Sequence, residues 1–229
     1  GPMVAAGRFL RRLGADGGLD RVSRVCVRLH GSLAFTGKGH GTDTAVVLGL
    51  LGKTPETMDP DAAPAMLDGI AASGELRLGG GTVIRFDAER DIIFDFGSAL
   101  EGHANGLVLE AFDADGKSIL QRTYFSIGGG FVMSADELIA AADEAPLAEV
   151  PHGFKTAVEM LAMGDEGSIS IAGMKMANEA TVMSEAEVRA GLDRIWAAME
   201  GSIERGLRQT GDLPGPLGVK RRACAILES

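Results

Sequence analysis

The sequence is poor in cysteine and has no long apolar run. Its two cysteines, Cys26 and Cys224, lie far apart in the chain, and no CxxC pair occurs. Two distant thiols cannot by themselves hold structural zinc or an iron–sulfur cluster. No apolar stretch is long enough to span a membrane, and the start of the sequence has no signal-peptide pattern. These absences predict a reduced, cytoplasmic protein with no membrane partner.

Positive charge is also scarce. The 229 residues hold 22 Lys and Arg against 32 Asp and Glu, which gives a net charge of -10. Nucleic-acid binding needs a basic face, and the densest basic cluster is only the short run 220–222, which is more typical of a solvated turn. We therefore expect no nucleic-acid partner. Aromatic residues make up only 5%, but 45% of the chain is hydrophobic, which is enough for an aliphatic core.

Strand patterns fill the first half of the sequence and helix patterns fill the second. β-rich runs predict strands at 22–29, 82–86, 92–96, 107–112 and 118–127, with Asp115-Gly116 as a hairpin turn between the last two. Apolar spacing and capping signals predict helices at 4–13, 44–51, 61–72, from 134 onward, and at 188–207. Thr42 or Asp43 is the expected N-cap of the second helix, and Ser134/Glu137 and Ser184/Glu187 are expected capping boxes.

This order of elements predicts an α+β fold. We expect an N-terminal α/β domain with a mixed or antiparallel sheet, followed by an all-α segment. The composition changes near residues 145–151, so the predicted domains are 1–147 and 148–229.

The most polar loop of the predicted sheet is Gly31–Asp43, which we call the glycine–histidine loop. It has four glycines in thirteen residues and joins a strand pattern to a helix pattern. Glycines that open the backbone beside several hydrogen-bonding side chains are typical of a loop that binds a small polar ligand. The candidate residues are Lys38, His40, Thr42 and Asp43.

The residues alone leave their roles open. Lys38 does not fit a phosphate loop, because Gly39 follows it where Ser or Thr is required. Lys38 is either a cation for a substrate carboxylate or a solvated charge, and the second is the more common case. His40 is a candidate general acid or base, although a lone loop histidine more often supports a turn. By contrast, His30 ends a predicted strand and is expected to be structural.

The residues alone also leave the roles of two further polar segments undecided. Asn105 either binds a ligand or supplies a left-handed turn residue before Gly106. Ser126 precedes a second glycine run, 128–130, which either admits a ligand to the backbone or lets the strand turn.

Seven motifs in this order resemble the single-chain, iron–sulfur-dependent bacterial L-serine dehydratases, also called L-serine deaminases. The motifs span nearly the whole chain, and the two glycine motifs are long and specific. They are Gly1-Pro-Met3, the glycine–histidine loop, Thr54-Pro-Glu-Thr57, Thr123-Tyr-Phe-Ser-Ile-Gly-Gly-Gly-Phe131, Asn178-Glu179, Ile203-Glu-Arg-Gly206, and Leu213-Pro-Gly-Pro-Leu217 followed by Arg221-Arg222-Ala223.

The departures from that family predict a fragment. In the family, Gly-Pro-Met follows a Ser-Ser-Ser-His-Thr loop, and the chain continues past Arg-Arg-Ala into a helical catalytic domain with the cluster cysteines. Neither part is present here, and neither Cys26 nor Cys224 matches a cluster position. Residues 1–147 then correspond to the beta-type domain, and residues 148–229 to the start of the truncated, alpha-type catalytic domain.

The resemblance implies an L-serine ammonia-lyase that converts L-serine, its small-molecule substrate, to pyruvate and ammonia by β-elimination. A [4Fe-4S] cluster, with ligands outside this chain, would act on the serine hydroxyl as a Lewis acid, and no pyridoxal phosphate (PLP) is implied. His40 matches the acid/base histidine of the family. A homodimer is expected. The implied substrate-binding neighbours are Lys38, Thr42, Asp43, Asn105 and Ser126.

A non-catalytic module remains the alternative. The beta-type domain of these enzymes resembles a regulatory domain of some phosphoglycerate dehydrogenases, which predicts serine sensing without turnover.

Overall fold

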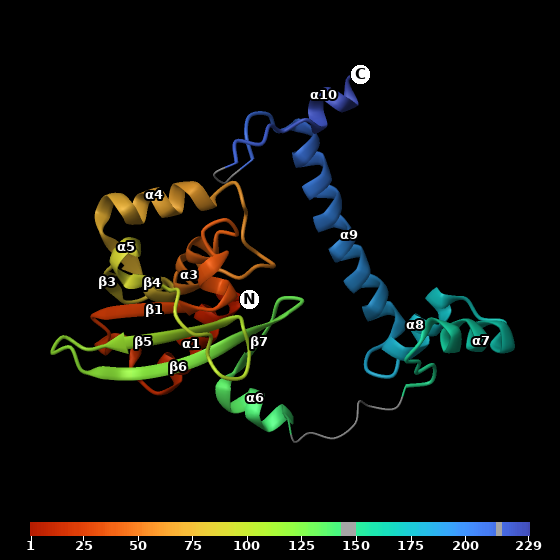
Figure 1. The fold of residues 1–229 in the computed structure, drawn as a ribbon, viewed down its shortest axis with the longest axis horizontal. Coiled ribbons are helices and arrows are strands. Elements are labelled where there is room, and N and C mark those ends of the chain that lie inside the picture. Colours follow the sequence, from red (N-terminus) through yellow and green to blue (C-terminus); the bar gives the residue numbers. More distant parts are fainter. Residues whose placement is uncertain (143–149, 214–216) are drawn as a thin grey trace. The chain divides into compact units, whose positions relative to one another are not determined.

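The computed structural model describes residues 1–142, 150–213 and 217–229. The chain divides into two compact units, Gly1–Glu144 and Ala145–Ser229 (Figure 1). The predicted boundary between residues 147 and 148 lies outside the described residues, as do residues 214–216 of the motif at 213–217.

A five-stranded mixed sheet forms the centre of the first unit, in the order β4-β1-β5-β6-β7. Strands β1 and β4 are parallel, and every other neighbouring pair is antiparallel. The predicted hairpin is confirmed, since β5 and β6 pair on either side of the Asp115-Gly116 turn. The strands are β1 (Arg24–His30), β4 (Ile92–Asp95), β5 (Gly106–Phe112), β6 (Ser118–Gly128) and β7 (Phe131–Ser134).

The core of this unit lies between the sheet and two helices, α1 (Pro2–Ala15) and α3 (Thr42–Leu50). Alternate residues of β1 and β5 point into it, as the two-residue period of a strand requires, and Leu29 and Leu109 are fully buried there. Helix α1 contributes Phe9 and Leu13 at a spacing of four residues, which places both on its inner face.

The first unit also holds further helices and a second, smaller sheet. Strands β2 and β3 form a small antiparallel sheet of their own, and α4 contacts α3 and β2. These elements are η1 (Leu19–Arg21), α2 (Ser32–Phe35), α4 (Ala63–Ser73), β2 (Glu75–Arg77), η2 (Leu78–Gly80), β3 (Val83–Arg85), α5 (Ala88–Asp91) and α6 (Ala135–Ala142).

The described residues of the second unit are helical apart from loops and one isolated bridge between Asp212 and Lys220. Its helices are α7 (Ala157–Gly167), α8 (Ile171–Glu179), α9 (Glu185–Arg208) and α10 (Ala223–Leu227). The capping box of Ser184 and Glu187 starts α9 as predicted. Within the described ranges, no helix combines the length and apolarity that crossing a membrane requires.

The α+β prediction is confirmed, and two local expectations are corrected. Gly41, not Thr42 or Asp43, is the N-cap of α3, and no side chain caps this helix. Gly41 has a φ of 62°, a left-handed turn that Thr or Asp would adopt with strain. Between the strands predicted at 82–86 and 92–96, residues 88–91 form the short helix α5, capped by Asp87. Asn105 is not left-handed, because Ser168 is the one described non-glycine residue with positive φ.

Candidate active site

The glycine–histidine loop leaves the sheet where β1 ends. Gly31 has a φ of 53°, and a β-carbon there would overlap the carbonyl of Ala104. The loop then forms α2, turns through residues 36–41 and enters α3. The carbonyl of Gly37 closes this turn by accepting a hydrogen bond from the Thr42 amide at 2.9 Å. The loop is therefore a compact turn with backbone hydrogen bonds of its own.

His40 is exposed at the turn of this loop, and its Nδ1 lies 2.9 Å from the carbonyl oxygen of Thr36. A carbonyl oxygen only accepts hydrogen bonds, so Nδ1 must carry the proton. A neutral imidazole protonated on Nδ1 has its lone pair on Nε2. The loop backbone thus orients His40, and among the residues that the structure describes Nε2 has no hydrogen-bond partner, which is the geometry that a proton acceptor needs.

Lys38 and Asp43 bind each other across the same loop. The Lys38 Nζ lies 3.0 Å from one carboxylate oxygen of Asp43, and the other oxygen accepts from the Thr44 amide at 3.0 Å. The ammonium also lies 5.0 Å from the centre of the Phe94 ring. The Lys38 side chain is 76% exposed, so one face of its ammonium stays open to solvent. Thr42, next to this pair, is buried at the start of α3.

Asn105 and Ser126 form a second group, where β5 begins and β6 ends. The Asn105 side-chain amide donates to the Ser126 carbonyl at 3.2 Å, and the Ser126 amide donates to the Asn105 carbonyl at 2.9 Å. Gly1 packs against the Ser126 side chain so closely that a β-carbon on Gly1 would overlap the hydroxyl. Three segments that are distant in sequence therefore meet at this point.

The sheet topology brings both groups to one edge. Strand β1 ends there, and the antiparallel pairing of β5 and β6 places the start of one and the end of the other at the same edge. The two segments also touch, because the Ser32 amide donates to the Ala104 carbonyl at 2.9 Å. Within the described part of the chain, no hydrogen bond or ion pair joins His40 directly to Asn105 or Ser126.

The second glycine run is a tight hairpin turn. Residues 128–130 all have positive φ and join β6 to β7. The alternative in which these glycines let the strand turn is therefore confirmed.

His30 is a residue whose environment the sequence did not reveal. It is 8% exposed, and neither ring nitrogen has a hydrogen-bond partner in the described ranges of the chain. Asp95, its neighbour on β4, lies 3.7 Å from Nδ1, too far for a hydrogen bond. Burial lowers the pKa of His30, although Asp95 opposes this shift. A strand-end histidine beside a paired aspartate carries no local sequence signal, because their contact depends on parallel pairing.

The described residues do not fit an iron–sulfur cluster. No group of three or more His, Cys, Asp or Glu among them could hold a metal ion. Cys26 lies on β1 and Cys224 on α10, in different units, and both are free. Burial raises the pKa of Cys26, and a hydrogen bond to Glu228 raises that of Cys224. Both shifts favour the thiol over the thiolate that binds iron.

Comparison with known proteins gives a consistent family assignment. Residues 1–137 match the family described as serine dehydratase beta chain. The chain is 42% identical over 226 residues to an L-serine dehydratase of Streptomyces coelicolor, and 40% identical over 227 residues to L-serine dehydratase TdcG of Escherichia coli. An L-serine dehydratase of Haemophilus influenzae is 32% identical over 227 residues.

These alignments cover the chain almost completely but only part of each relative. They include 98% or 99% of this chain and 49% of each of the three relatives. The chain therefore spans about half the length of the curated relatives it matches.

Proposed function

The chain belongs to the serine dehydratase beta-chain family, and from this premise we propose that the intact protein is an L-serine ammonia-lyase. In this proposal it converts L-serine to pyruvate and ammonia. β-Elimination removes the Cα proton and loses the Cβ hydroxyl as water. The aminoacrylate that forms tautomerises to an imine, which water hydrolyses to pyruvate and ammonia. The names of the relatives favour this enzyme over the non-catalytic serine-binding module.

His40 is the proposed base, and its hydrogen bond to Thr36 carries the proposal. Because the Thr36 carbonyl accepts from Nδ1, the Nε2 lone pair is the one available to take the Cα proton of serine. The exposed position of His40 lets a substrate approach Nε2. The backbone of the turn fixes the ring, which reduces the ordering that proton transfer requires.

The other loop residues are proposed to bind and orient the substrate. An ammonium has three N–H donors, and Asp43 uses one of those on Lys38, so donors remain for a substrate carboxylate. Asp43 also holds the Lys38 side chain in place. Asn105 and Ser126 lie at the same sheet edge, and we assign them to substrate binding from that placement. Thr42 is buried at the start of α3, and its role in substrate binding stays a prediction.

We further propose that the intact protein is iron–sulfur dependent, with cluster ligands outside this chain. The described residues do not fit the cluster, so no step of the reaction is derived through it. A cytoplasmic location and a homodimer complete the proposal. The location follows from the two distant, free cysteines, which are usual in a reducing compartment.

The test is pyruvate formation by the intact protein, prepared without oxygen, with His40→Asn and His40→Ala as variants. Loss of a general base costs about 10²- to 10⁴-fold, so we expect kcat to fall by that factor while KM changes much less. The matched control is His152→Asn, because His152 lies in the second unit and its hydrogen bonds to Asn178 are made by its backbone. This control is expected to keep wild-type kcat.

Two results would contradict the proposal in different ways. Wild-type turnover in both His40 variants would remove His40 from the mechanism while leaving the reaction intact. Saturable serine binding to the intact wild-type protein without pyruvate formation would instead support the non-catalytic module.

A further inference from the structure

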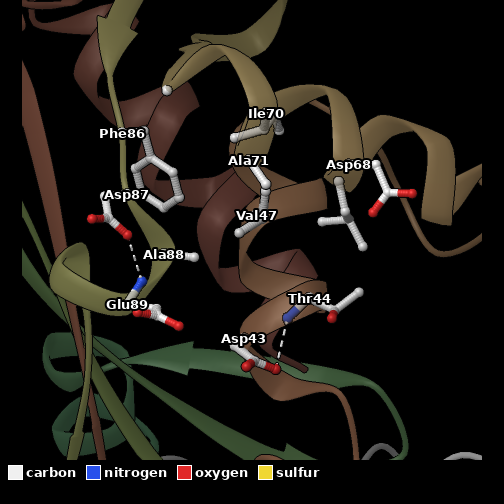
Figure 2. A pocket seen from close by; sticks show the side chains of 12 residues that line it. Asp43, Thr44, Val47, Asp68, Ile70, Ala71, Phe86, Asp87, Ala88 and Glu89 are labelled. Atoms are coloured by element: carbon white, nitrogen blue, oxygen red, sulfur yellow. Dashed lines mark hydrogen bonds between the residues drawn. The ribbon is translucent and has the colours of Figure 1, made fainter.

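A cavity of about 540 Å³ lies within the first unit, beside α3 (Figure 2). Helices α3 and α4 and the segment from β3 to α5 form its walls. Its volume falls in the range of roughly 300–1,000 Å³ that is usual for small-molecule sites. Of its lining residues only Asp43 belongs to one of the sequence motifs, because the walls come from three separate stretches of the chain.

The floor of this cavity is apolar. Val47 of α3 and Ile70 of α4 face the ring of Phe86 across it, with Ala71 beside them, and Leu67 is a further apolar lining residue. Phe86 is itself anchored in the hydrophobic core. An apolar body that covered this floor would be removed from water, which favours binding in proportion to the area buried.

The rim of the cavity is acidic. Asp43, Asp68, Asp87 and Glu89 line it, and no Lys, Arg or His is among the twelve lining residues. Figure 2 shows Asp87 and Glu89 on one side, Asp68 on the opposite side, and Asp43 at the start of α3. Within the described residues, the carboxylates of Asp68 and Glu89 have no hydrogen-bond or ion-pair partner. A rim of one sign around an apolar floor favours a ligand of opposite charge.

We propose that this cavity binds a small organic cation, with an ammonium or guanidinium group on an aliphatic or aromatic body. The apolar floor takes the body, and the rim carboxylates take the charge. Serine does not match this site, because its carboxylate would face the acidic rim and it has no apolar body. A bare metal ion does not match either, because the carboxylates surround the floor instead of converging.

Asp43 links this cavity to the glycine–histidine loop. One oxygen of its carboxylate binds Lys38 and the other accepts from the Thr44 amide. Lys38 therefore neutralises part of the acidic rim and competes with a cationic ligand for the same carboxylate. Removal of the Lys38 charge is expected to tighten binding, whereas removal of any rim charge is expected to weaken it.

The test is titration of the 229-residue chain with 2-phenylethylammonium, followed by calorimetry and by amide chemical shifts. The neutral 2-phenylethanol and the anionic 3-phenylpropanoate serve as matched probes of similar shape. We expect the amine to bind, the alcohol to bind roughly tenfold more weakly and the acid not to bind. The shifted amides are expected to come from α3, α4 and α5. Because the rim is exposed, 0.5 M salt is expected to weaken amine binding.

Four variants test the role of charge. Asp68→Asn and Glu89→Gln are each expected to weaken amine binding by about threefold, the effect of one exposed charge, and Lys38→Met to strengthen it by a similar factor. Asp115→Asn is the matched control, since Asp115 lies in the β5–β6 hairpin outside the cavity and Asn-Gly suits that turn equally well. Both rim residues are exposed, so their variants are expected to keep the wild-type melting temperature.

Four results would overturn the proposal. These are failure of the amine to bind, equal affinity for the amine and the alcohol, unchanged affinity in both rim variants, and amide shifts confined to residues outside the cavity. Binding of a lysine-rich peptide at the cavity without binding of the amine would assign the site to a protein partner instead.

Discussion

Helices α1 and α9 carry the same kind of apolar stripe, but only α1 buries it. The stripe of α1 packs under the sheet, where Phe9 and Leu13 are fully buried. On α9 the first stripe residue, Val188, is buried, whereas residues 192, 195, 196, 199 and 203 are between 51% and 58% exposed. Of the buried apolar residues in the described ranges, only Met174 and Val188 belong to the second unit.

The difference separates two sources of helix stability. Packing of an apolar face against a core is the main source in most proteins, and α1 has it. Helix α9 has little such packing among the described residues, so it depends on local signals. These include its capping box and the ion pair between Glu204 and Arg208 at 2.8 Å. The periodicity of a sequence therefore predicts that a helix has an apolar face without indicating what covers that face.

The largest expected change in stability comes from a Leu→Ala substitution, made once in the core of the first unit and once on the exposed stripe of α9. Leu109→Ala removes a fully buried side chain from the core of the first unit and is expected to lower the free energy of unfolding by about 3 kcal/mol. Leu192→Ala removes a half-exposed side chain from α9, so its expected cost is within about 0.5 kcal/mol. Urea unfolding followed by circular dichroism measures both. Equal costs would show that the stripe of α9 is packed as well as the core.

The first unit also buries a charged side chain, Asp91, and its substitution is expected to have an intermediate effect on stability. Its carboxylate is fully buried and accepts hydrogen bonds from Arg24 Nε at 2.9 Å, from Arg90 Nη2 at 3.2 Å and from the Asp87 amide at 3.0 Å. Burial alone raises the pKa of Asp91, but the hydrogen bonds from Arg90 and the other two donors outweigh it and hold the pKa below its usual value.

Asp91→Asn is expected to lower the free energy of unfolding at pH 7 by about 2 kcal/mol. The folded pKa lies below the unfolded value of about 3.9, so the contribution of Asp91 is complete well above that value and is lost as the pH falls through the folded pKa. The free energy of unfolding, measured with urea between pH 7 and pH 3, should therefore decrease less steeply with falling pH in the variant than in the wild type. The control is Glu204→Gln on α9, whose exposed ion pair should leave the acid slope nearly unchanged. Identical slopes for wild type and Asp91→Asn would contradict the assignment.

Much of the fold follows from the sequence because its signals are local. Alternating strand residues, the Asp115-Gly116 turn and the capping boxes each act within a few residues, and all of them are confirmed. The start of α3 was predicted less well. Thr42 and Asp43 are good N-cap types, but Gly41 takes the position because the preceding turn requires a left-handed residue.

In the candidate site, too, local features could be predicted from the sequence and features that depend on long-range packing could not. The glycine–histidine loop was visible as a motif, and its inner contacts, including that of His40 with Thr36, join residues four or five positions apart. The cavity beside Asp43 and the orphaned imidazole of His30 were not visible. Both depend on segments that only the sheet and helix packing bring together, such as β4 beside β1 and α4 beside α3.

The smallest effect tests whether local signals hold α9. Ser184 accepts a hydrogen bond from the Glu187 amide, and the Glu187 carboxylate accepts from the Ser184 amide at 2.8 Å. Ser184→Ala removes the side-chain half of this box and is expected to cost about 1 kcal/mol. Because α9 has little core packing, that loss should appear as fraying, measured as reduced ellipticity at 222 nm. The matched control is Ser202→Ala in the exposed interior of α9, where alanine is the better helix former and ellipticity should hold or rise. Equal responses would mean that the cap is dispensable and that packing, not local sequence, holds this helix.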